Sequence, residues 1–111
     1  MGRSAQRKGR AAEVELAGKL RDLGFADAQP GPPVSFGSAP DVVGIDGVHV
    51  ECKSVRNLNL PAALRQAAED AQYFADGLPV VFHKHPRQGW VASMSLGDWA
   101  LMCHAAASAD G

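Results

Sequence analysis

Two carboxylates and an ammonium group lie close together in the middle of the chain: Pro40-Asp41, nine intervening residues, then Glu51-Cys52-Lys53. Mg²⁺ prefers carboxylate oxygens in proteins, together with substrate phosphate and water. A lysine beside such a site can orient the attacking water or neutralise charge that develops on a phosphate. If the fold brings these groups together, they are the minimum set for metal-dependent cleavage of a phosphodiester.

A β-hairpin is predicted to position these groups. Residues 42–45 and 48–53 are rich in β-formers and flank Asp46-Gly47, a strong hairpin turn signal. Side chains alternate between the two faces of a strand, so we expect an apolar face toward the core and a polar face toward a groove. The polar face carries His49, Glu51 and Lys53, and the apolar face carries Val48, Val50 and Cys52.

The length of the turn decides whether the two carboxylates meet. A two-residue turn at Asp46-Gly47 would place Asp41 opposite Cys52, on the wrong face. A three-residue turn over 45–47, with Gly47 left-handed, pairs Asp41 directly with Glu51. We predict the three-residue turn, because a one-residue slip separates the carboxylates. The alternative is an ordinary edge hairpin with a solvated Glu-x-Lys pair.

The first predicted helix spans residues 7–23 and ends at Gly24. Glu13 lies beside its apolar stripe, where a carboxylate is costly to bury unless a cation or a donor meets it. A role at a metal site explains that position. A border residue that extends to water is the alternative. The stripe consists of Ala12, Leu16, Leu20 and Leu23.

Four parts follow one another along the chain: Arg7-Lys8-Gly9-x-x-x-Glu13 on the opening helix, Pro40-Asp41, Glu51-Cys52-Lys53, and a following helix with Gln66. In this order they resemble the PD-(D/E)XK nuclease superfamily, over about residues 7 to 99. Within it, the chain is most similar to archaeal-type Holliday junction resolvases and to small phage or bacterial endonucleases of that kind.

The resemblance implies a site as well as an activity. It implies Mg²⁺ as the cofactor, with Mn²⁺ able to substitute, and metal ligands at Asp41, Glu51 and the backbone carbonyl of Cys52. It further implies that Lys53 orients the water or stabilises charge. Glu13 would complete the metal shell directly or through water, and Gln66 would lie near the site.

The expected fold is α/β, with a restriction-endonuclease-like core. We expect a mixed sheet of about four strands with helices on both faces, in a single domain over 1–111 that has a basic arm at 1–8 and a frayed tail at 108–111. The later elements are expected to be a helix from Pro61 to about residue 76, strands over 79–85 and 90–94, and a last helix over about 95–106 that opens on a Ser95-x-x-Asp98 capping box.

The formal net charge is −1, so only its distribution can favour a nucleic-acid partner. Four basic residues precede the first acidic one, and others fall around the expected groove. The candidate DNA-binding residues are Arg3, Arg7, Lys8, Arg10, Arg56, Arg65, Lys84 and Arg87. A solvated arm is the alternative for the N-terminal set. The acidic residues expected mostly elsewhere are Asp22, Asp27, Glu69, Asp70 and Asp76. Whether residues 31–38 contact DNA is left open.

The two cysteines do not resemble a disulfide framework. Cys52 is expected in the core and Cys103 on the buried side of the last helix, which is typical of a reducing cytoplasm, or a host cytoplasm for a phage protein. No secretion signal or membrane span is expected. His83 and His85 with Cys103 and His104 give only a weak zinc pattern, against surface or phosphate-contacting histidines. Trp90 and Trp99 are expected to anchor the core.

These observations favour a Mg²⁺-dependent DNA endonuclease. The leading activity is Holliday junction resolution on branched DNA, in recombination and repair, by a homodimer that cuts two strands symmetrically. One alternative is a nicking or repair endonuclease that acts on other DNA structures. A second is a non-catalytic DNA-binding module with a nuclease fold, for which clustered carboxylates beside DNA phosphate have no evident use.

Overall fold

The computed structural model describes the backbone of residues 2–32 and 40–110, and the side chains of residues 9–32 and 40–109. The elements in chain order are α1 (Gly2–Asp22), β1 (Gln29–Pro30), β2 (Val42–Val43), β3 (Val48–Lys53), α2 (Leu60–Phe74), β4 (Leu78–His85), β5 (Gly89–Ser93) and α3 (Leu96–Asp110).

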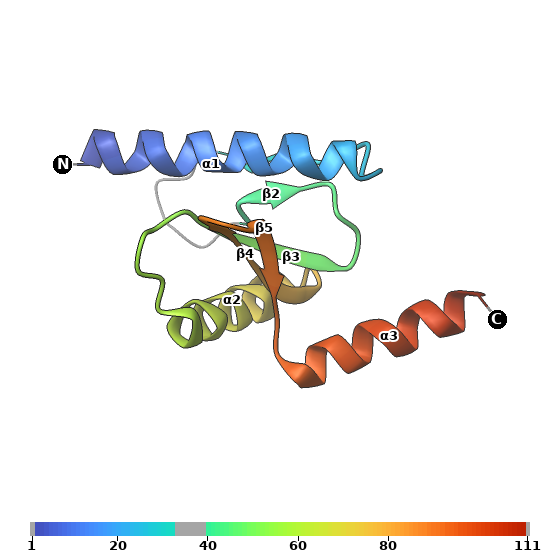
Figure 1. Cartoon of the computed structure of the whole chain (residues 1–111). Helices are drawn as coiled ribbons and strands as arrows, with labels where there is room; N and C mark the ends of the chain where they lie inside the picture. Colours follow the sequence, from blue (N-terminus) through green and yellow to red (C-terminus); the bar gives the residue numbers. More distant parts are fainter. Residues whose placement is uncertain (1, 33–39, 111) are drawn as a thin grey trace.

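One five-stranded mixed sheet forms the centre, in the order β1-β2-β3-β4-β5. β3 and β4 are parallel, and the other neighbours are antiparallel. Helix α2 connects β3 to β4, since parallel strands need a crossover. The helix α1 covers one face and α2 the other (Figure 1). The α/β class and the helices on both faces are therefore confirmed. The sheet has one strand more than expected: β1, which is only two residues long and was not predicted.

The first core cluster lies between α1 and the sheet. It consists of Leu16, Ala17, Leu20, Ala28, Val42 and Val50, with Val48, Cys52 and Trp90 packed against it. The apolar face predicted for β3, the core position of Cys52 and the anchoring role of Trp90 are confirmed. Leu23 is instead 75% exposed. The helix ends at Asp22, and the left-handed Gly24 (φ 106°) turns the chain there, so Leu23 leaves the apolar stripe.

At its other end, α1 begins at Gly2 rather than near Arg7. Residues 2–8 therefore extend the helix and do not form a separate arm (Figure 1). The side chains of Arg3, Arg7 and Lys8 lie outside the described residues.

The second core cluster lies between α2 and the sheet, and its buried members are Ala63, Ala67 and Val81. Asn59 caps α2, its side chain accepting a hydrogen bond from the Ala62 N–H at 3.1 Å. The small alanines let α2 lie close to β3. The expected open groove on the polar face of β3 is therefore wrong at two positions: His49 is 0% exposed and Glu51 is 8% exposed.

Helix α3 extends away from the sheet (Figure 1). Both faces of the sheet are already covered by α1 and α2, so α3 has no sheet face to cover. Its large apolar residues are consequently exposed: Leu96, Trp99 and Leu101. The expectations that Trp99 anchors the core and that Cys103 is buried are both wrong. The Ser95 cap is confirmed, with Ser95 Oγ accepting from the Asp98 N–H at 3.1 Å. The helix continues to Asp110, so residues 108–110 are helical rather than frayed.

Candidate functional site: a carboxylate cluster between β3 and the two helices

The predicted register of the hairpin is present, but its turn is closed around two residues: the Val48 N–H donates to the Ile45 carbonyl at 3.3 Å, across Asp46 and Gly47. Val42 pairs with Val50, but Asp41 does not continue this regular pairing, because its N–H also donates to the Val50 carbonyl, at 2.9 Å. Gly47 is left-handed, with φ 80°. The Asp41 carboxylate nevertheless lies close enough to Glu51 for its negative charge to raise the pKa of Glu51. The chain therefore brings the two carboxylates of the central motif to neighbouring positions.

The Asp41 carboxylate is held against β3, where its Oδ2 accepts a hydrogen bond from the Cys52 N–H at 2.7 Å. The N–H and C=O of one strand residue point to the same edge. The Cys52 carbonyl therefore lies on the side of β3 that Asp41 occupies, as its expected role requires. Burial raises the pKa of Asp41, while the Cys52 hydrogen bond and the nearby Lys53 ammonium act in the opposite direction.

Glu51 and Lys53 share the face of β3 that α2 covers. The Lys53 Nζ lies 3.4 Å from Glu51 Oε1, and about a third of the Lys53 side chain remains exposed. Burial, followed by the negative charge of Asp41, raises the pKa of Glu51 to about 7, although Lys53 lowers it. Without a further cation, this carboxylate is therefore only partly ionised near neutral pH.

Glu13 reaches the cluster from α1. Burial and the neighbouring Asp41 raise the pKa of its carboxyl group, and Arg10 acts against both. Arg10 Nη1 lies 3.5 Å from Glu13 Oε2 and donates a 2.6 Å hydrogen bond to the Gly31 carbonyl. Arg10 thus links Glu13 to the Gly31 backbone, while its side chain remains 47% exposed.

All three of these carboxyl groups influence the pKa of the Cys52 thiol. Burial raises its pKa to about 12, and the charges of Asp41, Glu13 and Glu51 add to that effect. The central motif and the helix carboxylate therefore form one electrostatic cluster.

A second set of acidic and imidazole groups comes from α2 and β3, and it was not expected from the sequence. One ligand atom each from His49, Glu51 and Asp70 lies within 4.8 Å of the others, the only such group of three found in the described part of the chain. Asp41 is not a member. Asp70, which the sequence analysis placed elsewhere, is 6% exposed.

The spacing along α2 could have revealed Asp70. It lies three residues after Ala67 and seven after Ala63, both buried, so it falls on the helical stripe that faces the sheet. Gln66 is exposed, and its Nε2 donates to the two Asp70 carboxylate oxygens at 3.2 and 3.3 Å. Gln66 therefore contacts the cluster through Asp70.

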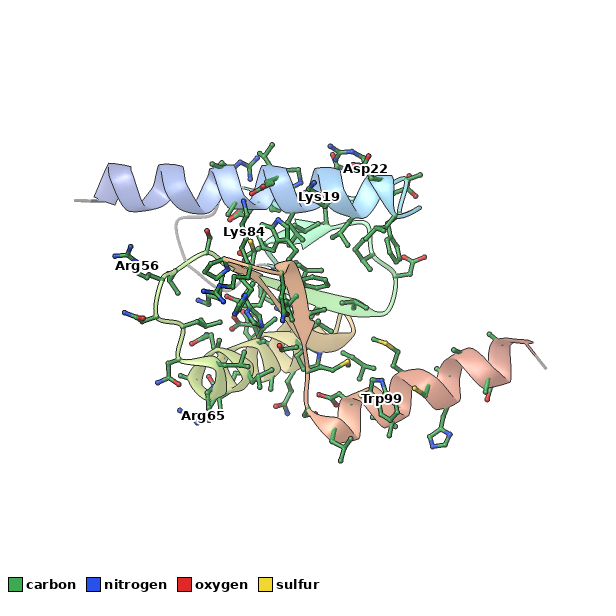
Figure 2. The ribbon with its side chains drawn as sticks, in the orientation of Figure 1. Lys19, Asp22, Arg56, Arg65, Lys84 and Trp99 are labelled. Atoms are coloured by element: carbon green, nitrogen blue, oxygen red, sulfur yellow. The ribbon has the colours of Figure 1, made fainter. Side chains whose placement is uncertain are left out.

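The basic residues divide into two groups. Arg56, Lys84 and Arg87 line an open pocket of about 380 Å³ beyond the ends of β3 and β4, and Lys84 Nζ also lies 2.9 Å from Glu15 Oε1. Arg65 is exposed on the side of α2 that faces away from the sheet (Figure 2). Among the members of the expected DNA-binding set whose side chains are described, Arg65 therefore lies apart from the three residues at the pocket.

The weak zinc pattern gains no geometric support within the residues that the structure describes. His83 Nε2 and Ser93 Oγ are 2.8 Å apart in a hydrogen bond, and Cys103 and His104 are exposed on α3. None of these residues joins the three-ligand group of His49, Glu51 and Asp70.

In comparisons with known proteins, no family model matches the chain. No match is found among curated proteins or solved structures either. The resemblance to PD-(D/E)XK nucleases therefore depends on the residues and motifs themselves. Within residues 2–32 and 40–110, no helix has the length and apolar character needed to cross a membrane.

Proposed function

We propose that this protein is a metal-dependent DNA endonuclease with a core of the restriction-endonuclease type. The observation that carries the proposal is the cluster at β3: the Asp41 carboxylate accepts a hydrogen bond from the Cys52 N–H at 2.7 Å, beside Glu51, and the Lys53 ammonium lies 3.4 Å from Glu51. A binding module has no use for buried carboxylates next to the phosphates it contacts, because like charges repel. A hydrolase needs them to hold a cation.

The residues fit a hard divalent cation. Burial is the largest cause of the raised pKa of Glu13, Asp41 and Glu51, and a bound cation would offset the cost of ionising carboxyl groups in that setting. Asp41, Glu51 and the Cys52 carbonyl would hold Mg²⁺ or Mn²⁺, with Glu13 at the edge. When bound, the cation supplies Lewis-acid activation of water and of the phosphate.

The other residues position the substrate and stabilise charge. Lys53 lies beside Glu51 and would orient the attacking water or stabilise the developing phosphate charge. Arg56 and Arg87, in the pocket beyond the strand ends, would hold the DNA backbone so that the scissile phosphate reaches the carboxylates. Such contacts position DNA without reading its sequence.

The leading substrate is branched DNA, in particular a four-way junction cut by a homodimer. This assignment derives from the resemblance of the motifs to junction resolvases. Two cuts at symmetry-related positions require two copies of the site related by a two-fold axis.

The test is cleavage of a labelled four-way junction, set beside linear duplex and single strands, in Mg²⁺, Mn²⁺ or chelator. We expect metal-dependent cuts in the junction, and Asp41→Asn or Glu51→Gln should abolish them while the chain stays folded. Asp46→Asn is the matched control, since it removes an exposed carboxylate in the same hairpin and creates another favourable turn pair. Cleavage by both active-site variants at the wild-type rate would contradict the proposal. DNA binding without cleavage would favour the non-catalytic module.

A further inference from the structure

We propose that His49, Glu51 and Asp70 form a binding site for a divalent transition-metal ion between β3 and α2. One ligand atom from each lies within 4.8 Å of the others. All three residues are buried, with exposed fractions of 0%, 8% and 6%. This ligand set differs from the Asp41–Glu51 pair and shares only Glu51 with it.

One nitrogen of the His49 imidazole is held by a hydrogen bond, and the other is available to a ligand. Its Nδ1 lies 2.8 and 2.9 Å from the two carboxylate oxygens of Asp76. A carboxylate can only accept, so Nδ1 carries a proton, and Nε2 is the ring nitrogen that can offer a lone pair to a metal ion. That Nε2 is buried and has no hydrogen-bond partner among the described residues. Buried polar atoms are nearly always satisfied, and a metal ion would satisfy this one.

Asp76 has the role of an outer-shell carboxylate. A metal-ligating histidine usually donates its other ring N–H to a carboxylate or carbonyl, which fixes the tautomer and the ring orientation. His49 and Asp76 have this same arrangement. The ring of Phe74, stacked at a centroid distance of 6.4 Å, further restricts the imidazole.

Asp70 is held in place by its own helix. Gln66, one turn earlier, donates to both of its oxygens. Ala67 and Ala71 flank it with exposed fractions of 0% and 6%, and these small side chains let the carboxylate approach the strand. Two buried carboxylates that face each other repel unless a cation lies between them.

The donor atoms determine the class of metal. Two carboxylates alone would suit Mg²⁺ or Ca²⁺, but an imidazole nitrogen favours first-row transition metals. The expected order of affinity is Zn²⁺ above Mn²⁺, with Mg²⁺ weakest. Three protein ligands leave a position open, as in catalytic rather than structural zinc sites.

Metal binding at this site does not require nuclease activity, because only the three ligands and a cation take part. Its test therefore uses no DNA. Titration calorimetry of the metal-depleted full chain with Zn²⁺ gives the affinity, and long-range ¹H–¹⁵N spectra follow the ring nitrogens of all four histidines.

We expect stoichiometric Zn²⁺ to shift Nε2 of His49 while the nitrogens of His83, His85 and His104 stay in place. Asp70→Asn conserves volume and should weaken Zn²⁺ binding by about a hundredfold. Asp76→Asn keeps an acceptor for Nδ1 and should weaken it by about tenfold or more, as outer-shell changes do.

Two controls make the result decisive. Asp46→Asn should leave the Zn²⁺ affinity unchanged, and Asp41→Asn should change it by less than Asp70→Asn does. Circular dichroism of each variant shows whether the fold is retained. An unshifted His49 signal at saturating Zn²⁺ would overturn the proposal, as would equal affinity in Asp70→Asn. Cleavage that fails in every metal would leave this result unaffected.

Discussion

Glu51 is approached from two sides, by Asp41 across the hairpin and by Asp70 from α2. Burial and both negative charges favour its protonated form, and its pKa is about 7 against an ordinary value of 4.5. A carboxyl group in this setting opposes folding once it ionises, unless a cation is bound. The acid that is proposed to hold metal is therefore also a source of instability in the metal-free chain.

This gives a pH dependence with a definite sign. The folded state binds the Glu51 proton more tightly than the unfolded state, so its contribution to stability is fully present below about 4.5 and is lost as the pH rises through about 7. In chelator, the free energy of unfolding from urea titrations should fall across that window by up to about 3 kcal/mol. Glu51→Gln should flatten the profile, while Asp46→Asn should not. A wild-type profile unchanged by Glu51→Gln would contradict the assignment.

Lys53 carries a second prediction at the residue scale. If it stabilises charge or orients water, Lys53→Ala should slow single-turnover cleavage by about a hundredfold or more, the usual cost of losing one such group. DNA affinity, measured by fluorescence anisotropy, should change little. Lys19→Ala, which removes an exposed cation from α1 (Figure 2), is the matched control. Loss of binding in parallel with turnover would assign Lys53 to DNA contact instead.

The sequence predicted one half of this cluster and missed the other for a physical reason. Strand alternation and hairpin register are local, so the pairing of Val42 with Val50, and with it the approach of Asp41 to Glu51, follows from a count of residues. The burial of His49 is not local, because it depends on α2 returning over the polar face of β3. Asp70 was misplaced for the same reason, since a carboxylate on a buried helical stripe was not expected.

At the scale of elements, the connection between α2 and β4 packs against the hairpin turn that precedes β3. This contact holds the two halves of the sheet together. Gly77 has φ 142°, and its Cβ, if present, would meet the backbone of Gly47 and Val48. The Leu78 N–H donates to the Gly47 carbonyl at 2.9 Å. Both points of contact are backbone, so neither can move aside as a flexible side chain would.

Gly77→Ala should therefore destabilise the fold strongly, by about 2 kcal/mol or more, since steric overlap adds to an unfavourable backbone conformation. Urea unfolding followed by circular dichroism measures the change. Gly97→Ala is the matched control: Gly97 lies in α3, and its added Cβ would meet nothing within 4 Å. That variant should be neutral or stabilising by up to about 1 kcal/mol, from helix propensity alone. Equal effects of the two substitutions would contradict the close approach.

Helix α3 marks where prediction of elements ends. Its existence and its Ser95 cap followed from the sequence, because caps are local signals. The position of α3 in the fold did not follow from the sequence, because apolar residues such as Trp99 and Leu101 are typical of a helix that packs against a core. Only the completed sheet, with α1 and α2 on its two faces, shows that no face remains for α3 (Figure 1).

At the scale of the whole molecule, the net charge gives little information about DNA binding, and the positions of the basic residues give more. The chain carries −1 overall, yet Arg56 and Arg87 gather at one pocket beyond the ends of β3 and β4. If DNA lies there, Arg56→Ala and Arg87→Ala should each weaken binding to duplex and junction alike, and each should lower the slope of log affinity against log salt by about one. Anisotropy titrations over a salt series measure both, with Lys19→Ala as control. An unchanged slope would place the DNA elsewhere.

Junction resolution requires two copies of the site in one complex, because each chain has one proposed cluster and a junction needs two cuts. A two-fold dimer supplies both and sets the distance between them, so the preference for branched over linear DNA should come from that spacing. Sedimentation of the protein with four-way junction DNA should show two chains per junction. Mixed dimers of wild type and Glu51→Gln should then nick a single strand. A complex with one chain per junction would contradict the resolvase assignment and would favour a nicking endonuclease, because one cluster can cut only one strand at a time.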